Sequence, residues 1–234
     1  MRLCAGDPLP HHSPGARPSV GGRLASLLGA ASFGAAAGLI APWVAPGPTA
    51  AAPCPGAEVV FARGREEPPG PGYVGNAFVN ALRPKLPTMT VASYGVNYPA
   101  DISPAKGADD MSAHVQSMAH SCPETRMVLG GYSLGAAAAD LVIAVAKPAF
   151  GFTNPLPPAM ADHIAAVALF GNGTRRIVGP LSNVSPAFAG KTIDQCAAGD
   201  PICSNGTNWP SHFQPAYIDS GLVDQAAGFA AGKL

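Results

Sequence analysis

Residues 126–135 read Arg-Met-Val-Leu-Gly-Gly-Tyr-Ser-Leu-Gly, and this stretch decides the fold. The apolar run Met127 to Leu129 favours a buried strand, and the alanines that follow Gly135 favour a helix that packs closely against it. Between them lies the pattern Gly131-x-Ser133-x-Gly135, in which glycines without a Cβ permit a tight strand-to-helix turn. We therefore predict that Ser133 stands on a sharp turn at the carboxyl edge of a parallel sheet.

On both sides of this turn, apolar runs alternate with amphipathic segments, which is typical of a parallel sheet with helices on both faces. The strands are predicted at Glu58–Ala62, Thr88–Tyr94, Arg126–Gly130, Ile164–Phe170 and Thr192–Asp194. The helices are predicted at Tyr73–Lys85, Ala105–Ser121, Leu134–Ala146 and Asp219–Ala231, with Pro148 ending the third. The fold class is therefore α/β with a five-stranded parallel sheet.

Composition limits the classes of partner. The chain has 234 residues, which suits one domain and a leader, and its charged residues amount to 12% with a formal net charge of zero. A protein that binds nucleic acid needs a basic face, so we exclude that class. No metal or phosphate-binding motif is present, and we predict no cofactor and no metal. We expect a monomer.

The first 52 residues differ from the rest. Arg17 and Arg23 precede an apolar stretch from Leu24 to about Ala45, and small residues run from Thr49 to Ala52. This order is typical of a secretory leader that is cleaved after small residues. The alternative is an N-terminal membrane anchor, since the apolar stretch is just long enough to span a bilayer. We predict a leader at 1–52, a mature domain at 53–234, no membrane span after cleavage, and a location outside the cell or in its envelope.

The cysteines agree with export. Without Cys4, which lies in the leader, four cysteines remain, and they allow three pairings. Cys196 and Cys203 flank a turn, which favours a bridge between them and leaves Cys54 to pair with Cys122. The alternative, a metal site, needs a C-x-x-C spacing or a neighbouring histidine, and the sequence has neither.

A serine hydroxyl is a poor nucleophile unless a base takes its proton, and the turn at Ser133 is typical of α/β hydrolases. In that class an acid and then a histidine follow the serine along the chain. His163 precedes a predicted strand and so lies at the wrong edge of the sheet, whereas His212 follows the last strand. We therefore predict His212 as the general base.

The acid must lie between Ser133 and His212. Asp140 is on the helix after the turn, Asp162 shares the wrong edge of the sheet with His163, and Asp194 lies within a strand. Asp200 follows the strand end inside the Cys196–Cys203 loop, which would hold its carboxylate in place. Asp200 is therefore predicted to orient His212. The alternative is that Asp200-Pro201 only starts a turn.

Several segments together resemble the cutinase family, in its bacterial cutinase-like branch. They are Val60–Gly64, Tyr98–Ala100, Gly131–Ser133 and Cys196–Cys203 followed by His212, and the resemblance spans about Cys54 to Gly232. The resemblance implies a compact, lidless, three-layer α/β hydrolase with Ser133, Asp200 and His212 as its triad. It also implies the bridges Cys54–Cys122 and Cys196–Cys203, and hydrolysis of ester or lipid substrates with short to medium acyl chains.

Two positions depart from the family pattern. The family usually has Ser or Thr after the Arg-Gly pair and Gln after the nucleophile, whereas this chain has Arg65 and Leu134. Because a main-chain N–H does not depend on the side chain, Arg65 and Leu134 should still supply the two donors of an oxyanion hole. The missing hydroxyl predicts a slower esterase.

Other functions and other wall residues stay open at this point. The alternatives are a catalytically weak, exported lipid-binding protein on a hydrolase scaffold, and an acyltransferase that uses the same acyl-enzyme. Five apolar residues are candidates for an acyl groove, or for ordinary packing: Leu134, Phe150, Phe152, Leu156 and Phe213.

Overall fold

The computed structural model describes residues 53–234. The predicted leader at 1–52, and its alternative as a membrane anchor, lie outside the described residues. Within residues 53–234, no helix is both long enough and apolar enough to cross a membrane.

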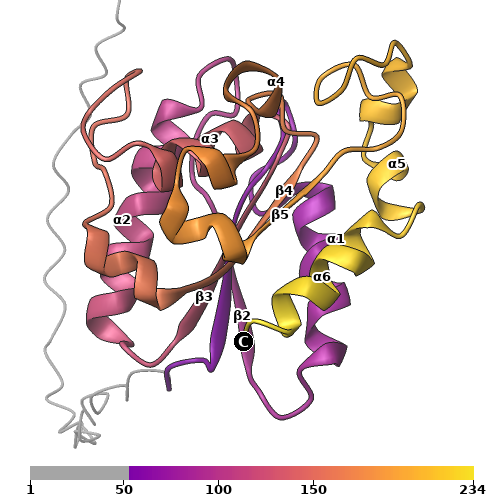
Figure 1. Ribbon diagram of the computed structural model, residues 1–234. Coiled ribbons are helices and arrows are strands. Elements are labelled where there is room, and N and C mark those ends of the chain that lie inside the picture. Colours follow the sequence, from indigo (N-terminus) through magenta and orange to yellow (C-terminus); the bar gives the residue numbers. More distant parts are fainter. Residues whose placement is uncertain (1–52) are drawn as a thin grey trace, which may run out of the picture. The chain divides into compact units, whose positions relative to one another are not determined.

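The architecture is a central sheet between two helical layers (Figure 1). Its strands, in the spatial order β2-β1-β3-β4-β5, are all parallel. The strands are β1 (Ala57–Ala62), β2 (Val91–Gly95), β3 (Arg126–Tyr132), β4 (Ile164–Phe170) and β5 (Thr192–Gln195). The helices are α1 (Gly72–Leu82), α2 (Ala105–Ser121), α3 (Leu134–Ala144), α4 (Arg175–Val178), α5 (Pro215–Ile218) and α6 (Leu222–Ala231). The α/β class and the five-stranded parallel sheet predicted from the sequence are therefore confirmed.

The apolar sequence of the central strands follows from burial on both faces. Every residue of β1 and of β4 is buried, as expected for strands covered by helices on either side. Helices α2 and α3 pack on one face of the sheet, and α1 and α6 pack on the other (Figure 1). Each face therefore has its own hydrophobic core.

Several predicted boundaries were wrong by a few residues. Strand β3 continues to Tyr132, two residues past its predicted end, because Gly130 and Gly131 still pair with β1 and β4. Helix α1 gives way to a 3-10 turn at Arg83, next to Pro84, and α3 ends at Ala144 because Val145 is already extended. The predicted closing helix begins only at Leu222, after the left-handed Gly221, and the short helix α5 precedes it.

Both disulfides are present. Cys54, just before β1, is joined to Cys122, just after α2, with a Cα–Cα distance of 5.5 Å. Cys196 and Cys203 are joined across the loop that follows β5, with a Cα–Cα distance of 5.8 Å. The first bridge ties together the amino-terminal ends of β1 and β3, and the second lies at the carboxyl edge of the sheet.

Candidate active site

Ser133 lies on the turn between β3 and α3, with φ = 54° and ψ = −114°. A non-glycine residue in the left-handed half of the map is strained, and such strain is typical of functional turns. The turn is feasible only with glycine on both sides. A Cβ at Gly135 would lie 2.0 Å from the carbonyl oxygen of Ala62, and one at Gly131 would lie 2.2 Å from the carbonyl oxygen of Gly135. The glycines thus allow α3 to start directly against the sheet.

The predicted triad residues come together at this edge. The Ser133 hydroxyl lies 2.9 Å from His212 Nε2, and His212 Nδ1 lies 2.7 Å from Asp200 Oδ2. The Asp200 carboxylate is fully buried, whereas the His212 side chain remains 12% exposed. With its proton on Nδ1, His212 donates to Asp200 and accepts from Ser133, which is the tautomer that a general base requires.

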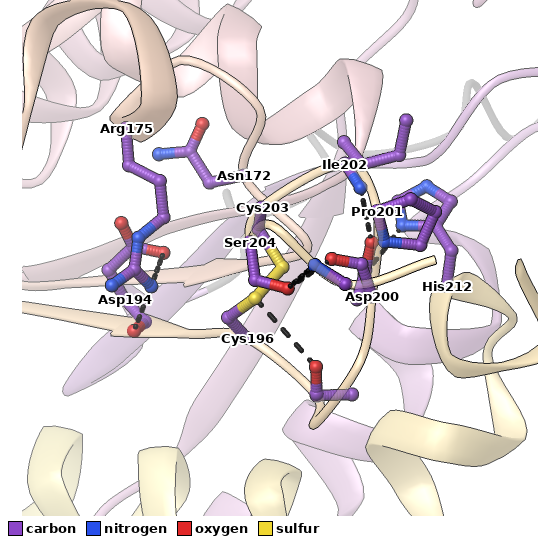
Figure 2. Close-up of a disulfide and its surroundings, with 12 residues drawn as sticks. Asn172, Arg175, Asp194, Cys196, Asp200, Pro201, Ile202, Cys203, Ser204 and His212 are labelled. Carbon is purple, nitrogen blue, oxygen red and sulfur yellow. Dashed lines mark hydrogen bonds and ion pairs between the residues drawn. A yellow bond between two sulfur atoms is a disulfide. The ribbon is translucent and has the colours of Figure 1, made fainter. Parts of the chain in front are cut away.

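Asp200 is fixed from several directions. Its Oδ1 accepts the main-chain N–H of Ile202 at 2.7 Å, and its Oδ2 accepts the hydroxyl of Tyr217. Burial, and the hydrogen bond to Asp200, raise the pKa of Tyr217 well above its usual range, so the phenol stays a donor. The Cys196–Cys203 bridge closes the same loop (Figure 2). The carboxylate therefore has little freedom to turn away from His212.

The other acidic candidates have other partners. Figure 2 shows Asp194 beside Arg175, away from His212, and its Oδ1 lies 3.7 Å from the guanidinium. Asp140 Oδ2 accepts the side-chain amide of Asn172 at 2.9 Å and the hydroxyl of Thr174. Burial raises the pKa of each of these two carboxyl groups to about 6. Neither Asp140 nor Asp194 contacts His212, in keeping with the choice of Asp200.

Tyr132 holds the histidine loop from the strand that carries the nucleophile. Its hydroxyl donates to the carbonyl oxygen of His212, and its ring stacks near the imidazole, with 5.5 Å between ring centroids. Burial raises the pKa of Tyr132 well above its usual value, so this donor stays protonated. Gly171 lies beneath the imidazole, where a Cβ would come within 3.0 Å of His212 Cε1. Tyr132 and Gly171 therefore both lie close to the imidazole.

The segment after β1 forms the opposite side of the site. The buried Arg63 donates to the carbonyl oxygens of Glu67 at 2.8 Å and of Tyr98 at 2.6 Å. The buried Glu67 carboxylate accepts the N–H of Gly64 at 2.6 Å through Oε2, and the side-chain amide of Gln214 at 3.3 Å through Oε1. Glu67 therefore links the segment that carries Arg65 to the loop that carries His212.

A cavity of about 660 Å³ opens over these groups. Ser133, His212, Arg65 and Leu134 all line it. Within residues 53–234, no main-chain carbonyl outside the regular elements accepts the N–H of Arg65 or of Leu134. The rest of the wall is mostly apolar and includes residues that the sequence analysis did not single out: Gly173, Thr174, Ile177, Ile202 and Trp209.

Of the five apolar candidates, Leu134 and Phe213 line this cavity. Phe152 is only 1% exposed and belongs to the core, while Leu156 lines a different hollow near Val145. Phe150 is 84% exposed and lines a neighbouring cavity. Three supporting residues, Tyr132, Tyr217 and Glu67, were missed because each has a partner in a different segment: the His212 carbonyl, Asp200 and Gln214 respectively.

Comparisons with known proteins show the family of the chain. The family model described as Cutinase matches residues 53–234. Probable carboxylesterase Culp2 of Mycobacterium tuberculosis is 55% identical, over 91% of this chain and 96% of that protein. Phospholipase Culp4 of the same organism is 51% identical, over 95% of this chain and 97% of that protein.

Solved structures give the same result. A Trichoderma reesei cutinase in complex with a phosphonate inhibitor is 30% identical, with a TM-score of 0.62 over 77% of each chain. The catalytic core domain of acetyl xylan esterase from Trichoderma reesei is 26% identical, with a TM-score of 0.65 over 78% of this chain and all of that one. The fold, the family match and these relatives agree: the chain belongs to the cutinase family and is a carboxylic ester hydrolase.

Proposed function

We propose that this chain hydrolyses carboxylic esters with short to medium acyl chains through Ser133, His212 and Asp200. The observation that carries the proposal is the continuous chain of hydrogen bonds from the Ser133 hydroxyl, through both nitrogens of His212, to the buried Asp200. Ser133 and His212 line a cavity with a mostly apolar wall, in which the acyl part of an ester can be buried away from water.

The reaction proceeds in two halves. Ser133 Oγ attacks the ester carbonyl carbon while His212 Nε2 takes the hydroxyl proton, and Asp200 stabilises the imidazolium that forms. The main-chain N–H groups of Arg65 and Leu134 stabilise the charge on the carbonyl oxygen. His212 then gives the proton to the departing alcohol, which leaves an acyl group on Ser133. A water molecule attacks the acyl-enzyme by the same route and releases the acid.

A chain-length series tests this proposal. The purified protein, with its disulfides intact, is assayed on p-nitrophenyl esters of increasing acyl length, with Ser133→Ala as the control. We expect turnover with an optimum at short to medium chains, and no turnover above background in the control. A Ser133→Ala variant as active as the wild type would overturn the assignment of the nucleophile.

The assignment of the acid has its own test. Asp200→Asn keeps the size of the side chain but cannot hold His212 in the required tautomer, and we expect kcat to fall about 10³-fold to 10⁴-fold. Asp194→Asn is the matched control, because Asp194 pairs with Arg175 and is remote from His212. Equal losses in the two variants would contradict a specific role for Asp200.

We also propose that residues 1–52 form a leader and that residues 53–234 act as a monomer outside the cell or in its envelope. Two disulfides support this, because such bonds persist in oxidising compartments. The expected observation is an exported protein whose mass and amino-terminal sequence correspond to cleavage near residue 52. Recovery of the full-length chain in the cytoplasm, with free thiols, would count against it.

A further inference from the structure

A second cavity lies next to the one at Ser133. It has a volume of about 410 Å³ and lies between α3 and α4, which are neighbours in Figure 1. Ala137, Thr174 and Ile177 line both cavities, so the two hollows share a wall one helical turn beyond Ser133. The second cavity is therefore the hollow that a flexible chain anchored at Ser133 would reach on leaving the first in this direction.

The lining of the second cavity suits a hydrocarbon. Its polar residues, Asp140, Asn172 and Thr174, hydrogen-bond to one another. The remaining wall is mostly aliphatic and aromatic, formed chiefly by Leu141, Val145, Phe150, Val178, Leu181 and Val184. Both cavities lie within the range of about 300–1,000 Å³ that is common for small-molecule sites.

The rim of the second cavity is apolar where a soluble protein usually places polar residues. Phe150 is 84% exposed, Ile177 81%, Val178 51% and Val184 41%. A contiguous exposed apolar patch of this kind marks a binding surface more often than chance exposure. Because Ile177 of this patch also lines the Ser133 cavity, a ligand that extends from Ser133 onto the patch stays on an apolar surface.

Phe150 adds an independent observation. It occupies the first central position of a tight turn, with φ = 55°, followed by Gly151 with φ = 82°, and Ala149 and Phe152 pair across this turn. Two consecutive positive φ values define a type I′ turn, in which asparagine or glycine is the usual first residue. A bulky aromatic residue there is strained by its backbone and exposed to water. The backbone strain and the exposure of the apolar ring both indicate a functional role for Phe150 at the mouth of the cavity.

We propose that the second cavity binds the distal part of a long acyl chain whose ester carbon lies at Ser133. The chain would run past Ala137 and Ile177 and end beneath Phe150 and Val184. The inference rests on the proposed function, and it extends the range of that site from short and medium acyl chains to long-chain fatty esters. Short esters would use the Ser133 cavity alone.

The test compares a long and a short substrate in the same variants. p-Nitrophenyl palmitate and p-nitrophenyl butyrate are assayed at one fixed concentration of non-ionic detergent. Val184→Trp narrows the second cavity without touching the first, and Phe150→Asn removes the ring while suiting the positive φ. Ile102→Asn is the matched control, because Ile102 is 82% exposed and lines neither cavity.

We expect the wild type to hydrolyse both esters. Val184→Trp and Phe150→Asn should lower kcat/KM for palmitate about tenfold or more, in the range seen for lost pocket contacts, and leave butyrate within about twofold. Phe150→Asn should also fold at least as stably as the wild type, which excludes misfolding as the cause. Ile102→Asn should change neither rate.

Three results would overturn the inference. They are an unchanged palmitate-to-butyrate ratio in both variants, an equal loss in Ile102→Asn, and a wild type that cleaves butyrate but no palmitate. The proposed function fails differently, because in that case butyrate hydrolysis itself is absent or survives in Ser133→Ala.

Discussion

Arg65 is one of the two residues at which the sequence analysis finds a departure from the cutinase pattern. Its side chain is 58% exposed and forms only a loose ion pair with the neighbouring Glu66, at 3.6 Å. Such exposed pairs contribute little to stability. Position 65 is therefore free to vary without disturbing the fold, although the residue lines the cavity at Ser133.

Replacing Arg65 with threonine should speed the reaction. The new hydroxyl would add a donor beside the developing oxyanion, and one such donor is worth up to about 10²-fold in kcat. Arg65→Ala is the control, because it removes the guanidinium without adding a hydroxyl. The prediction is checked by kcat on a short ester, and it fails if the threonine variant is no faster than the alanine variant.

The buried Asp140 makes stability depend on pH. Burial raises its pKa from 3.8 to about 6, so between these values the folded chain holds a proton that the unfolded chain releases. The folded state then binds more protons, and the free energy of unfolding falls as pH rises through this window. In urea titrations, the stability of the wild type relative to Asp140→Asn should drop by about 1–3 kcal/mol from pH 4 to pH 7. A pH-independent difference would contradict this prediction.

At the residue scale, the sequence was most informative where chain order and sheet edge restrict the choice. Chain order leaves His163 and His212 as bases and four aspartates as acids, and the sheet edge then favours His212 over His163 and Asp200 over Asp162. The supporting roles of Tyr132 and Tyr217 were not predictable, because a tyrosine among apolar residues is normally interpreted as part of the hydrophobic core. Their hydroxyl partners, Asp200 and the His212 carbonyl, are identified only when distant segments meet in the folded chain.

At the scale of elements, a hydrogen bond joins the connection from β1 to α1 with the loop before α5. Glu67, in the first, reaches both the Gly64 N–H and the Gln214 amide, and its Oε1 also accepts the N–H of Tyr73 at 3.0 Å. Because all three partners are donors, the site needs a carboxylate with two accepting oxygens. The sequence did not predict the link from Glu67 to Gln214, because these two residues are remote in the chain. The 3-10 turns are short and local, and they carry no hydrophobic periodicity that would distinguish them from loops.

Glu67→Gln should therefore disturb positioning more than folding. One carboxylate oxygen becomes an amide that faces an N–H donor, and the segment carrying Arg65 should shift. We expect kcat to fall about 10-fold to 100-fold with KM nearly unchanged, as for a lost transition-state contact. Glu66→Gln, on an exposed neighbour, is the control and should behave as the wild type. A change confined to thermal stability would argue for a purely structural Glu67.

At the scale of the whole molecule, the two disulfides should have different roles, one in stability and one in activity. Cys54–Cys122 closes a long segment, with a sequence separation of 68, at the end of the sheet remote from Ser133. Cys196–Cys203 closes a short loop, with a separation of 7, around Asp200. The first bridge closes the longer loop, so it should contribute more to the free energy of unfolding. The second bridge lies beside Asp200, so its loss should affect kcat more.

Removing each bridge by paired serine substitutions should separate these effects. Loss of Cys54–Cys122 should lower the free energy of unfolding by about 4 kcal/mol and leave kcat near the wild-type value while the protein is folded. Loss of Cys196–Cys203 should cost less stability, about 2–3 kcal/mol, and reduce kcat more. Denaturant titrations and esterase rates measured on the same samples check this. A larger loss of stability without Cys196–Cys203, or a larger loss of kcat without Cys54–Cys122, would contradict these roles.

The two glycines of the Ser133 turn also have an evolutionary consequence. Positions 131 and 135 have no room for any other side chain, because backbone atoms occupy the space where a Cβ would lie. The exposed apolar residues around the two cavities are under no such restriction. A mutagenesis library that fixes the glycines and randomises 150, 177, 209 and 213 should therefore yield many folded variants with new acyl preferences. Enzymes of this kind can therefore change their acyl specificity while the turn that carries the nucleophile keeps its sequence.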